Sequence, residues 1–156
     1  MATQVNKTHY GARYRHRPRW MSYWLQIHCL EQLAAPGATV LLIGVGDGVV
    51  PEYLRQAGYW VTTLDIDPAL HPTVVGDVRR LPFPENNFDA VICAEVLEHL
   101  PFTEFTVGLK EIKRVTRHGA VISLPDARST LIDFHLKLPW LPRLEGFLKI
   151  ANGRGH

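Results

Sequence analysis

Short apolar runs alternate along the chain with longer segments in which apolar residues recur at every third or fourth position. A short run that is apolar on both faces is typical of a strand inside a parallel sheet, and the longer periodicity is typical of an amphipathic helix. The pattern predicts helices over 22–35, 51–58 and 103–117, and strands over 39–43, 60–64, 73–75, 88–93 and 120–124.

The predicted helix ends depend on capping residues and helix breakers. Ser22 and Thr103 are candidate N-caps, because their hydroxyl groups can accept hydrogen bonds from unpaired amides of the first turn. Pro36 and Gly37 follow the first helix, and Gly119 follows the last. We expect each helix to end at these residues.

Strands that alternate with helices predict an α/β fold: a Rossmann-like, doubly wound, mostly parallel sheet in a single domain. Ligands of such sheets bind beyond the carboxyl ends of the strands, where Asp65 and Asp77 converge with a glycine turn. The connection between 65 and 73 is too short for a crossover helix, so we expect a tight loop there.

The glycine turn lies in the segment LLIGVGDGVVPEYL, residues 41–54. Alternating glycines remove side chains from the turn, so that backbone amides can approach a ligand. A dinucleotide-binding turn needs its third glycine where this chain has Val49, and no tyrosine is followed by lysine four residues later, as in short-chain dehydrogenases. Both departures argue against a nicotinamide cofactor.

Charge is unevenly distributed along a chain whose formal net charge is only +2. No acidic residue precedes Glu31, and the basic residues of that stretch are Lys7, Arg13, Arg15, Arg17 and Arg19. One interpretation is a solvated basic arm over residues 1–20. The alternative is an arm that binds phosphate or nucleic acid, with Tyr10, Tyr14 and Trp20 as stacking surfaces.

Cysteine usage and hydropathy bear on the cellular context. Cys29 and Cys93 lie far apart, and neither has the paired spacing of a metal site. No apolar stretch is long enough to span a bilayer, and the arginine-rich start is not followed by the apolar core of a secretory signal. We therefore predict a cytoplasmic protein with reduced thiols and no membrane span.

The ordered motifs from about Trp20 to Pro125 resemble those of the class I S-adenosylmethionine-dependent methyltransferases, in particular the type 11 group. The segments that carry the resemblance are VLLIGVGDG, VTTLDIDP, VVGDVRRLPFPENNFDAVICAEVLEHL and LKEIKRVTRHGAVISLPD. The resemblance implies a methyltransferase core over 21–128, followed by a tail over 129–156 that partly covers the substrate. Relatives carry further C-terminal strands, which we expect to be missing or truncated here.

The resemblance also implies how S-adenosyl-L-methionine is bound. The cofactor-binding residues that it implies are Gly44, Val45, Gly46, Gly48, Asp65, Ile66, Asp77, Val78, Ala94 and Glu95. Asp65 would accept hydrogen bonds from the ribose hydroxyls, Asp77 would accept one from the adenine amino group, and Val78 would donate its amide to the ring. The alternative for both aspartates is ordinary turn chemistry at a strand end.

One position departs from the family pattern. The family usually has an acid at the position of Leu42, where it helps to anchor the methionine end of the cofactor. An apolar residue cannot do this, so either the affinity is lower or another group, from the segment that contains Tyr23 and Trp24, compensates.

The segment AEVLEHL leaves three interpretations open. If it is helical, Glu95, Glu98 and His99 project from one face. They are then the acidic start of a helix with a packed histidine, or His99 is a catalytic base or substrate contact, or the set binds a divalent metal ion. The third interpretation adds His156 and follows a resemblance to the metal sites of small-RNA 2'-O-methyltransferases and ubiquinone-pathway O-methyltransferases.

The sequence thus predicts a methyltransferase that acts on a small-molecule or lipophilic acceptor. One alternative is a cofactor-binding or assembly module without turnover, as Leu42 and the short C-terminal region indicate. Another is an RNA-end methyltransferase that uses the basic arm. Apolar residues of the tail, such as Trp140 and Phe147, suit either an acceptor or a second subunit in a homodimer.

Overall fold

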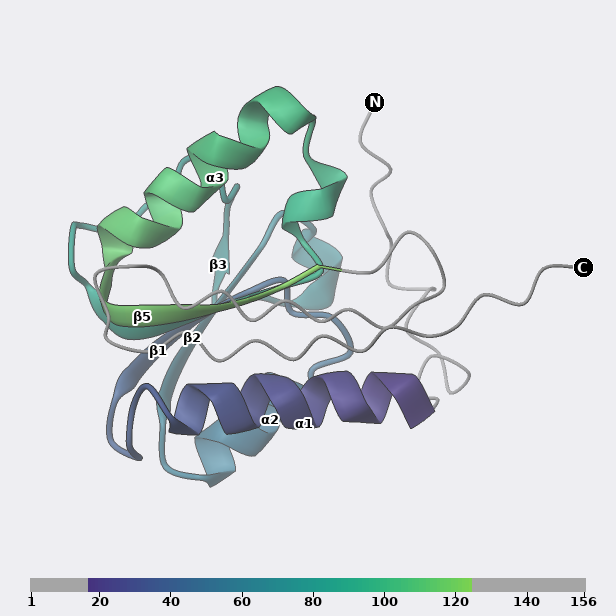
Figure 1. Cartoon of the computed structure of the whole chain (residues 1–156), viewed down its shortest axis with the longest axis vertical. Coiled ribbons are helices and arrows are strands. Elements are labelled where there is room, and N and C mark those ends of the chain that lie inside the picture. The colour runs from purple at the N-terminus through teal and green to yellow at the C-terminus, as the bar shows by residue number, and fades with distance from the viewer. Residues whose placement is uncertain (1–16, 125–156) are drawn as a thin grey trace, which may run out of the picture.

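The computed structural model describes residues 17–124, which form a three-layer arrangement of helices around one sheet (Figure 1). The strands are β1 (Thr39–Ile43), β2 (Trp60–Asp65), β3 (Val74–Val75), β4 (Phe88–Ala94) and β5 (Thr116–Ser123). The α-helices are α1 (Arg17–Glu31), α2 (Val49–Gln56) and α3 (Phe102–Val115), and the 3-10 helices are η3 (Pro68–Leu70) and η4 (Leu97–His99).

All five strands are parallel and lie in the order β3-β2-β1-β4-β5. The order reverses between β1 and β4, which is the point where doubly wound sheets bind their ligands. The Rossmann-like fold class predicted from the sequence is therefore confirmed. The short connection after β2 contains η3, whose first turn is capped by the carboxylate of Asp67.

Two apolar cores lie on opposite faces of the sheet because successive strand residues point to opposite sides. Val40 and Leu42 belong to the core beneath α1 and α2, whereas Leu41 and Ile43 belong to the core beneath α3. Figure 1 shows α3 on one side of the sheet, with α1 and α2 on the other. This double burial is why β1 appears in the sequence as an uninterrupted apolar run.

The predicted start of the first helix is wrong. Helix α1 begins at Arg17, so residues 17–20, assigned to the basic arm, are helical. Proline is tolerated at Pro18, because backbone amides in the first turn of a helix have no acceptor within the helix, so that the absence of an N–H group costs no hydrogen bond. Ser22 is no N-cap: its hydroxyl accepts a hydrogen bond at 3.2 Å from Nε2 of Gln26, within the helix.

The predicted limits of the last helix are also wrong. Helix α3 follows Pro101 directly, one residue before the predicted start at Thr103, and it ends at Val115 instead of Arg117. The hydroxyl of Thr116 donates to the carbonyl of Ile112 at 2.6 Å, while Thr116 already pairs with Phe88 in the sheet. Two β-branched residues at this junction favour the extended conformation, and β5 therefore starts four residues before the predicted strand, at 116 instead of 120.

The amino ends of three strands are joined by the carboxylate of Asp89. Its Oδ2 atom accepts from the amide and the hydroxyl of Thr39, both at 2.8 Å, and its Oδ1 atom accepts from Arg117 at 2.9 Å. The hydrogen bonds from Thr39, followed by the one from Arg117, lower the pKa of Asp89 from 3.8 to about 2. The charged form therefore ties β4 to β1 and β5, at the end of the sheet opposite the strand carboxyl ends.

We expect Asp89→Asn to lower the free energy of unfolding by about 1 kcal/mol at neutral pH, since solvent partly screens the ion pair. Because the pKa of Asp89 is depressed in the fold, its contribution is present above pH 3.8 and is lost as the pH falls through about 2. Urea titrations at several pH values measure this. Unfolding curves of the two proteins that differ equally at all pH values would contradict the assignment.

Candidate functional site

A cavity of about 530 Å³ lies at the carboxyl ends of the strands, with walls from β1, β2, β4 and the first turns of α1. The predicted cofactor-binding residues that line it are Gly44, Val45, Gly46, Asp65, Ile66, Asp77, Val78, Ala94 and Glu95. Gly48, the remaining one, does not line it. Glu98 and His99 are also part of the wall, whereas His156 lies outside the described residues.

All three glycines of the turn adopt left-handed backbone conformations that side chains disfavour, including Gly46 at φ +60°. Gly44 has φ +86°, and a Cβ atom there would lie 2.5 Å from Cγ2 of Val96. Gly48 has φ +80° at the N-cap of α2, a conformation that side chains disfavour, although the space around it is open. All three glycines thus meet a backbone requirement, and Gly44 and Gly46 also line the cavity, where a ligand can approach the backbone.

Asp65 connects the glycine turn to the loop that follows β2. Its Oδ2 atom accepts from the amide of Val45 at 2.8 Å, and its Oδ1 atom accepts from the amide of Asp67 at 2.9 Å. A carboxylate offers about four lone-pair positions. Each oxygen of Asp65 therefore keeps acceptor capacity, and the side chain lies on the cavity wall.

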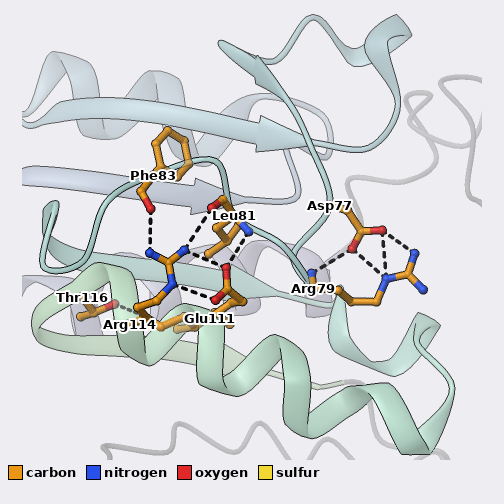
Figure 2. Close-up of polar contacts among 8 residues, drawn as sticks. Asp77, Arg79, Leu81, Phe83, Glu111, Arg114 and Thr116 are labelled. Atoms are coloured by element: carbon orange, nitrogen blue, oxygen red, sulfur yellow. Dashed lines mark hydrogen bonds and ion pairs between the residues drawn. The ribbon is translucent and has the colours of Figure 1, made fainter.

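The carboxylate of Asp77 is already engaged by Arg79 (Figure 2). Nε of Arg79 donates to both carboxylate oxygens at 2.9 Å, Nη2 donates to Oδ2, and the same guanidinium bonds Glu104 on α3. The hydrogen bonds from the Arg79 side chain are the main cause of a lowered pKa of Asp77. The role of Arg79 was not predicted, because the sequence does not indicate which acidic residue an exposed arginine will bind.

The loop that bears Asp77 and Val78 is fixed to α3 by an ion pair between Arg114 and Glu111 (Figure 2). Arg114 donates to the carbonyls of Phe83 at 2.7 Å and Leu81 at 3.0 Å. Glu111 in turn accepts from the amide of Leu81 at 2.8 Å. Both partners of the pair thus also satisfy the loop backbone, which holds this side of the cavity in place.

The opposite wall is formed by an ion pair between α1 and the end of β4. Nη1 of Arg19 lies 2.6 Å from Oε1 of Glu95, and both side chains are partly buried. Glu95 has φ +54°, an uncommon conformation for a residue with a side chain, and its amide donates to the carbonyl of Ser123. The sequence placed Arg19 in a basic arm, either solvated or binding phosphate or nucleic acid, and did not predict this contact because the helix was expected to start at Ser22.

Leu42 is buried and lines the cavity, so no acid is available at this position. Tyr23, one helical turn after Arg19, lines the cavity as well, whereas the side chain of Trp24 is 55% exposed and does not. Of the segment expected to compensate for Leu42, only Tyr23 therefore faces the site.

Glu98 is the acid whose titration the cavity changes most among the described residues. Burial raises its pKa to about 7, and the charge of Glu95 adds to the effect. Its Oε2 atom is buried and has no hydrogen-bond partner among residues 17–124. Nε2 of His99 lies 3.9 Å from Oε1 of Glu98, and His99 is the more exposed of the two.

The helical arrangement assumed for AEVLEHL is wrong. Only residues 97–99 are helical, in a single 3-10 turn, and Glu95 precedes that turn in a left-handed conformation. Glu95 is bound to Arg19, and no group of three or more potential metal ligands gathers within residues 17–124. The described part of the chain therefore does not form the predicted metal site.

Comparison with known proteins shows the family. A protein-family profile described as "Methyltransferase domain" matches residues 41–124, which include the glycine turn, Asp65, Asp77 and the segment around Glu98. The chain belongs to this methyltransferase domain family. The matched region is the part that builds most of the cavity.

A curated relative of this methyltransferase domain is the demethylmenaquinone methyltransferase of Corynebacterium efficiens. The two are 32% identical over 105 residues, which is 62% of this chain and 45% of the relative. The chain thus spans about half the length of the curated relatives that it matches.

Solved methyltransferases share the fold of this domain. One is the N-methyltransferase NodS from Bradyrhizobium japonicum in complex with S-adenosyl-L-homocysteine, which matches with a TM-score of 0.64 at 19% sequence identity. The match covers 76% of this chain and 67% of the NodS chain. The 1,6-didemethyltoxoflavin-N1-methyltransferase of Burkholderia thailandensis, with bound 1,6-didemethyltoxoflavin and S-adenosylhomocysteine, has a TM-score of 0.63 at 20% identity, with coverages of 79% and 60%. At these identities the likeness concerns the fold.

We expect Glu98→Gln to stabilise the protein at alkaline pH. Because the pKa of Glu98 is raised from 4.5 to about 7 in the fold, its favourable contribution is present below pH 4.5 and is lost as the pH rises through about 7. The neutral glutamine avoids that loss, so the variant should gain about 1 to 2 kcal/mol near pH 8 and little near pH 4.

Denaturant unfolding at both pH values measures this difference. Glu85→Gln, a change at an exposed glutamate away from the cavity, is the matched control and should show no such pH dependence. A Glu98→Gln protein that is less stable than the parent at alkaline pH would show that Glu98 is charged and paired instead.

Proposed function

We propose that this domain binds S-adenosyl-L-methionine in the cavity and transfers its methyl group to a small-molecule or lipophilic acceptor. The observation that carries the proposal is the position of Asp65, on the cavity wall and bonded to the glycine turn at Val45. The family supports the same function, as do the relatives named as methyltransferases.

The adenosine end is assigned to the β2 side of the cavity. Ribose hydroxyl groups can donate to the two oxygens of Asp65, each of which keeps acceptor capacity after its backbone hydrogen bond. Ile66, which is 54% exposed, lies at the cavity surface and supplies an apolar contact for the adenine ring. Asp77 can receive the adenine amino group only by sharing its oxygens with Arg79.

The methionine end is assigned to the side of Ala94 and Glu95. Arg19 supplies a cation to this wall, suited to the cofactor carboxylate, and Glu95 supplies an anion, suited to its ammonium group. Together with Tyr23, this pair takes the place of the acidic residue that the family usually has at the position of Leu42. In this arrangement α1, outside the region that defines the family, completes the cofactor site.

When bound, the cofactor supplies a sulfonium-activated methyl group, so that the protein mainly holds the acceptor in line and excludes water. Glu98 is the group of the described wall best placed to take up an acceptor proton, because it is buried and its pKa of about 7 allows both protonation states near neutral pH. His99 was predicted for this role. Its greater exposure and its distance of 3.9 Å from Glu98 suit a second proton carrier toward solvent. No step is assigned to a metal ion, because the described acidic residues do not converge as ligands.

The relatives indicate a class of acceptor. Those named demethylmenaquinone methyltransferases act, by their name, on a quinone, and we infer a lipophilic acceptor for this chain as well. Val96 and Leu100 flank Glu98 in the sequence and also line the cavity. Their apolar side chains provide a surface that suits such an acceptor.

A cofactor-binding module without turnover is the second candidate, and the buried Leu42 favours it. Such a module would bind the cofactor and its demethylated product but would not convert one into the other in the presence of a quinol, the reduced and nucleophilic form of such a quinone. Single-turnover measurements with radiolabelled cofactor separate the two functions.

The cofactor assignment predicts that Asp65→Asn weakens binding of S-adenosylhomocysteine about 10- to 100-fold, because hydrogen bonds to a charged acceptor are lost. Isothermal titration calorimetry measures the affinity. Asp67→Asn, two residues further on and outside the cavity wall, should bind as the parent does. Absence of heat and of thermal protection with the parent chain would contradict the proposal, and so would equal affinity of the Asp65→Asn variant.

A further inference from the structure

Helix α1 carries large apolar side chains on its outer face as well as on the face that packs against the sheet. Tyr23 and Leu30 are buried in the core on one side. Trp20, Met21 and Trp24 are 51%, 50% and 55% exposed on the other. The spacing of these three residues places them on one stripe, which we call the outer aromatic face of α1.

This face has the composition of a docking surface. Exposed apolar residues that occur singly are ordinary on proteins, but a contiguous group on one helix calls for a partner. Tryptophan is the residue enriched where proteins meet the headgroup layer of a membrane, because its ring is apolar and its indole N–H is polar.

Charge identifies the partner as anionic. Five basic residues and no acidic residue precede Glu31 in the sequence. Of these, Arg19 is paired with Glu95 across the cavity wall, and the other four precede it in the chain. Lysines and arginines that are close in sequence to an apolar helix face are attracted to anionic lipid headgroups.

Nucleic acid would also attract positive charge, but the side chains favour lipid. The ring of Trp24 is stacked on His28, with centroids 4.9 Å apart and planes 5° apart, so one face of the indole is already covered. Trp20 meets Tyr23 edge to face, and Met21 offers no ring for a base. Insertion among acyl chains and headgroups needs apolar area and no free ring face.

We propose that the outer aromatic face of α1 docks this protein onto an anionic lipid bilayer. The helix lies along the surface in this arrangement; none of the helices between residues 17 and 124 is both long enough and apolar enough to cross a membrane. Docking is peripheral, and the basic residues before α1 strengthen it electrostatically.

Docking in this way brings the cavity close to the lipid phase. Arg19 and Tyr23 line the cavity from the same turns of α1 that expose Trp20 and Trp24. The cavity wall therefore lies within about one helix diameter, roughly 10 Å, of the docked face. If the proposed function holds, a lipophilic acceptor can reach the site directly from the bilayer; the docking itself does not depend on that function.

The test is co-sedimentation of the full chain with vesicles of phosphatidylcholine that contain phosphatidylglycerol, and with vesicles of phosphatidylcholine alone. We expect binding to the anionic vesicles that weakens with added salt, and a loss of about tenfold or more in the Trp20→Ala/Trp24→Ala variant. Trp60→Ala is the matched control, since Trp60 is 70% exposed on β2 and lies outside the outer aromatic face.

Two further measurements keep the test independent of folding and of the proposed function. Quenching of tryptophan fluorescence by brominated lipid should occur in a Trp60→Ala/Trp140→Ala protein, whose remaining tryptophans are Trp20 and Trp24 of α1. Affinity for S-adenosylhomocysteine should be the same with and without Trp20 and Trp24, because neither lines the cavity.

Three results would overturn the proposal. The first is failure of the parent chain to bind anionic vesicles. The second is binding of a single-stranded RNA oligonucleotide, instead of vesicles, that the double variant loses. The third is a dimer in light scattering that the double variant converts to a monomer, since a second copy would then cover the face.

Discussion

The structure depends most on the hydrogen bond between the carboxylate of Asp65 and the amide of Val45. It joins the tip of β2 to the turn after β1, and this turn borders the point between β1 and β4 where the strand order of the sheet reverses. A second bond to the amide of Asp67 fixes the carboxylate between two loops. The position of this acceptor is therefore set by the fold before any ligand arrives, which is what tight binding of a polar ligand requires.

Two charged pairs hold the other walls of the cavity, one from behind the wall and one within its lining. Arg114 and Glu111 fasten the loop before β4 to α3 through backbone groups of Leu81 and Phe83. Arg19 and Glu95 join α1 to the end of β4. The first pair supports the adenine side of the proposed site and does not line the cavity, whereas the second lines it and can exchange partners with a ligand.

Local pattern accounts for the parts of the fold that depend on local physics. The central strands were predictable because both faces are buried, and Asp65 was predictable because it ends a β-branched strand at a fixed distance from the glycine turn. Partners distant in sequence were not: Arg19 and Glu95 lie 76 residues apart, and Arg114 and Phe83 lie 31 apart. The steric requirement for Gly44 was not predictable either. The side chain that would clash with a Cβ atom there belongs to Val96, which follows β4 and is distant in the sequence.

The central claim is that the cavity at the strand tips holds S-adenosylmethionine with its ribose on Asp65. A crystal structure of the chain grown with S-adenosylhomocysteine tests it most directly. We predict ligand density in the cavity, with ribose hydroxyls within hydrogen-bond distance of both Asp65 oxygens, the adenine ring beside Ile66, and the amino-acid end between Arg19 and Glu95. A ligand bound elsewhere, or a cavity still lined only by protein and water at saturating ligand, would contradict the account.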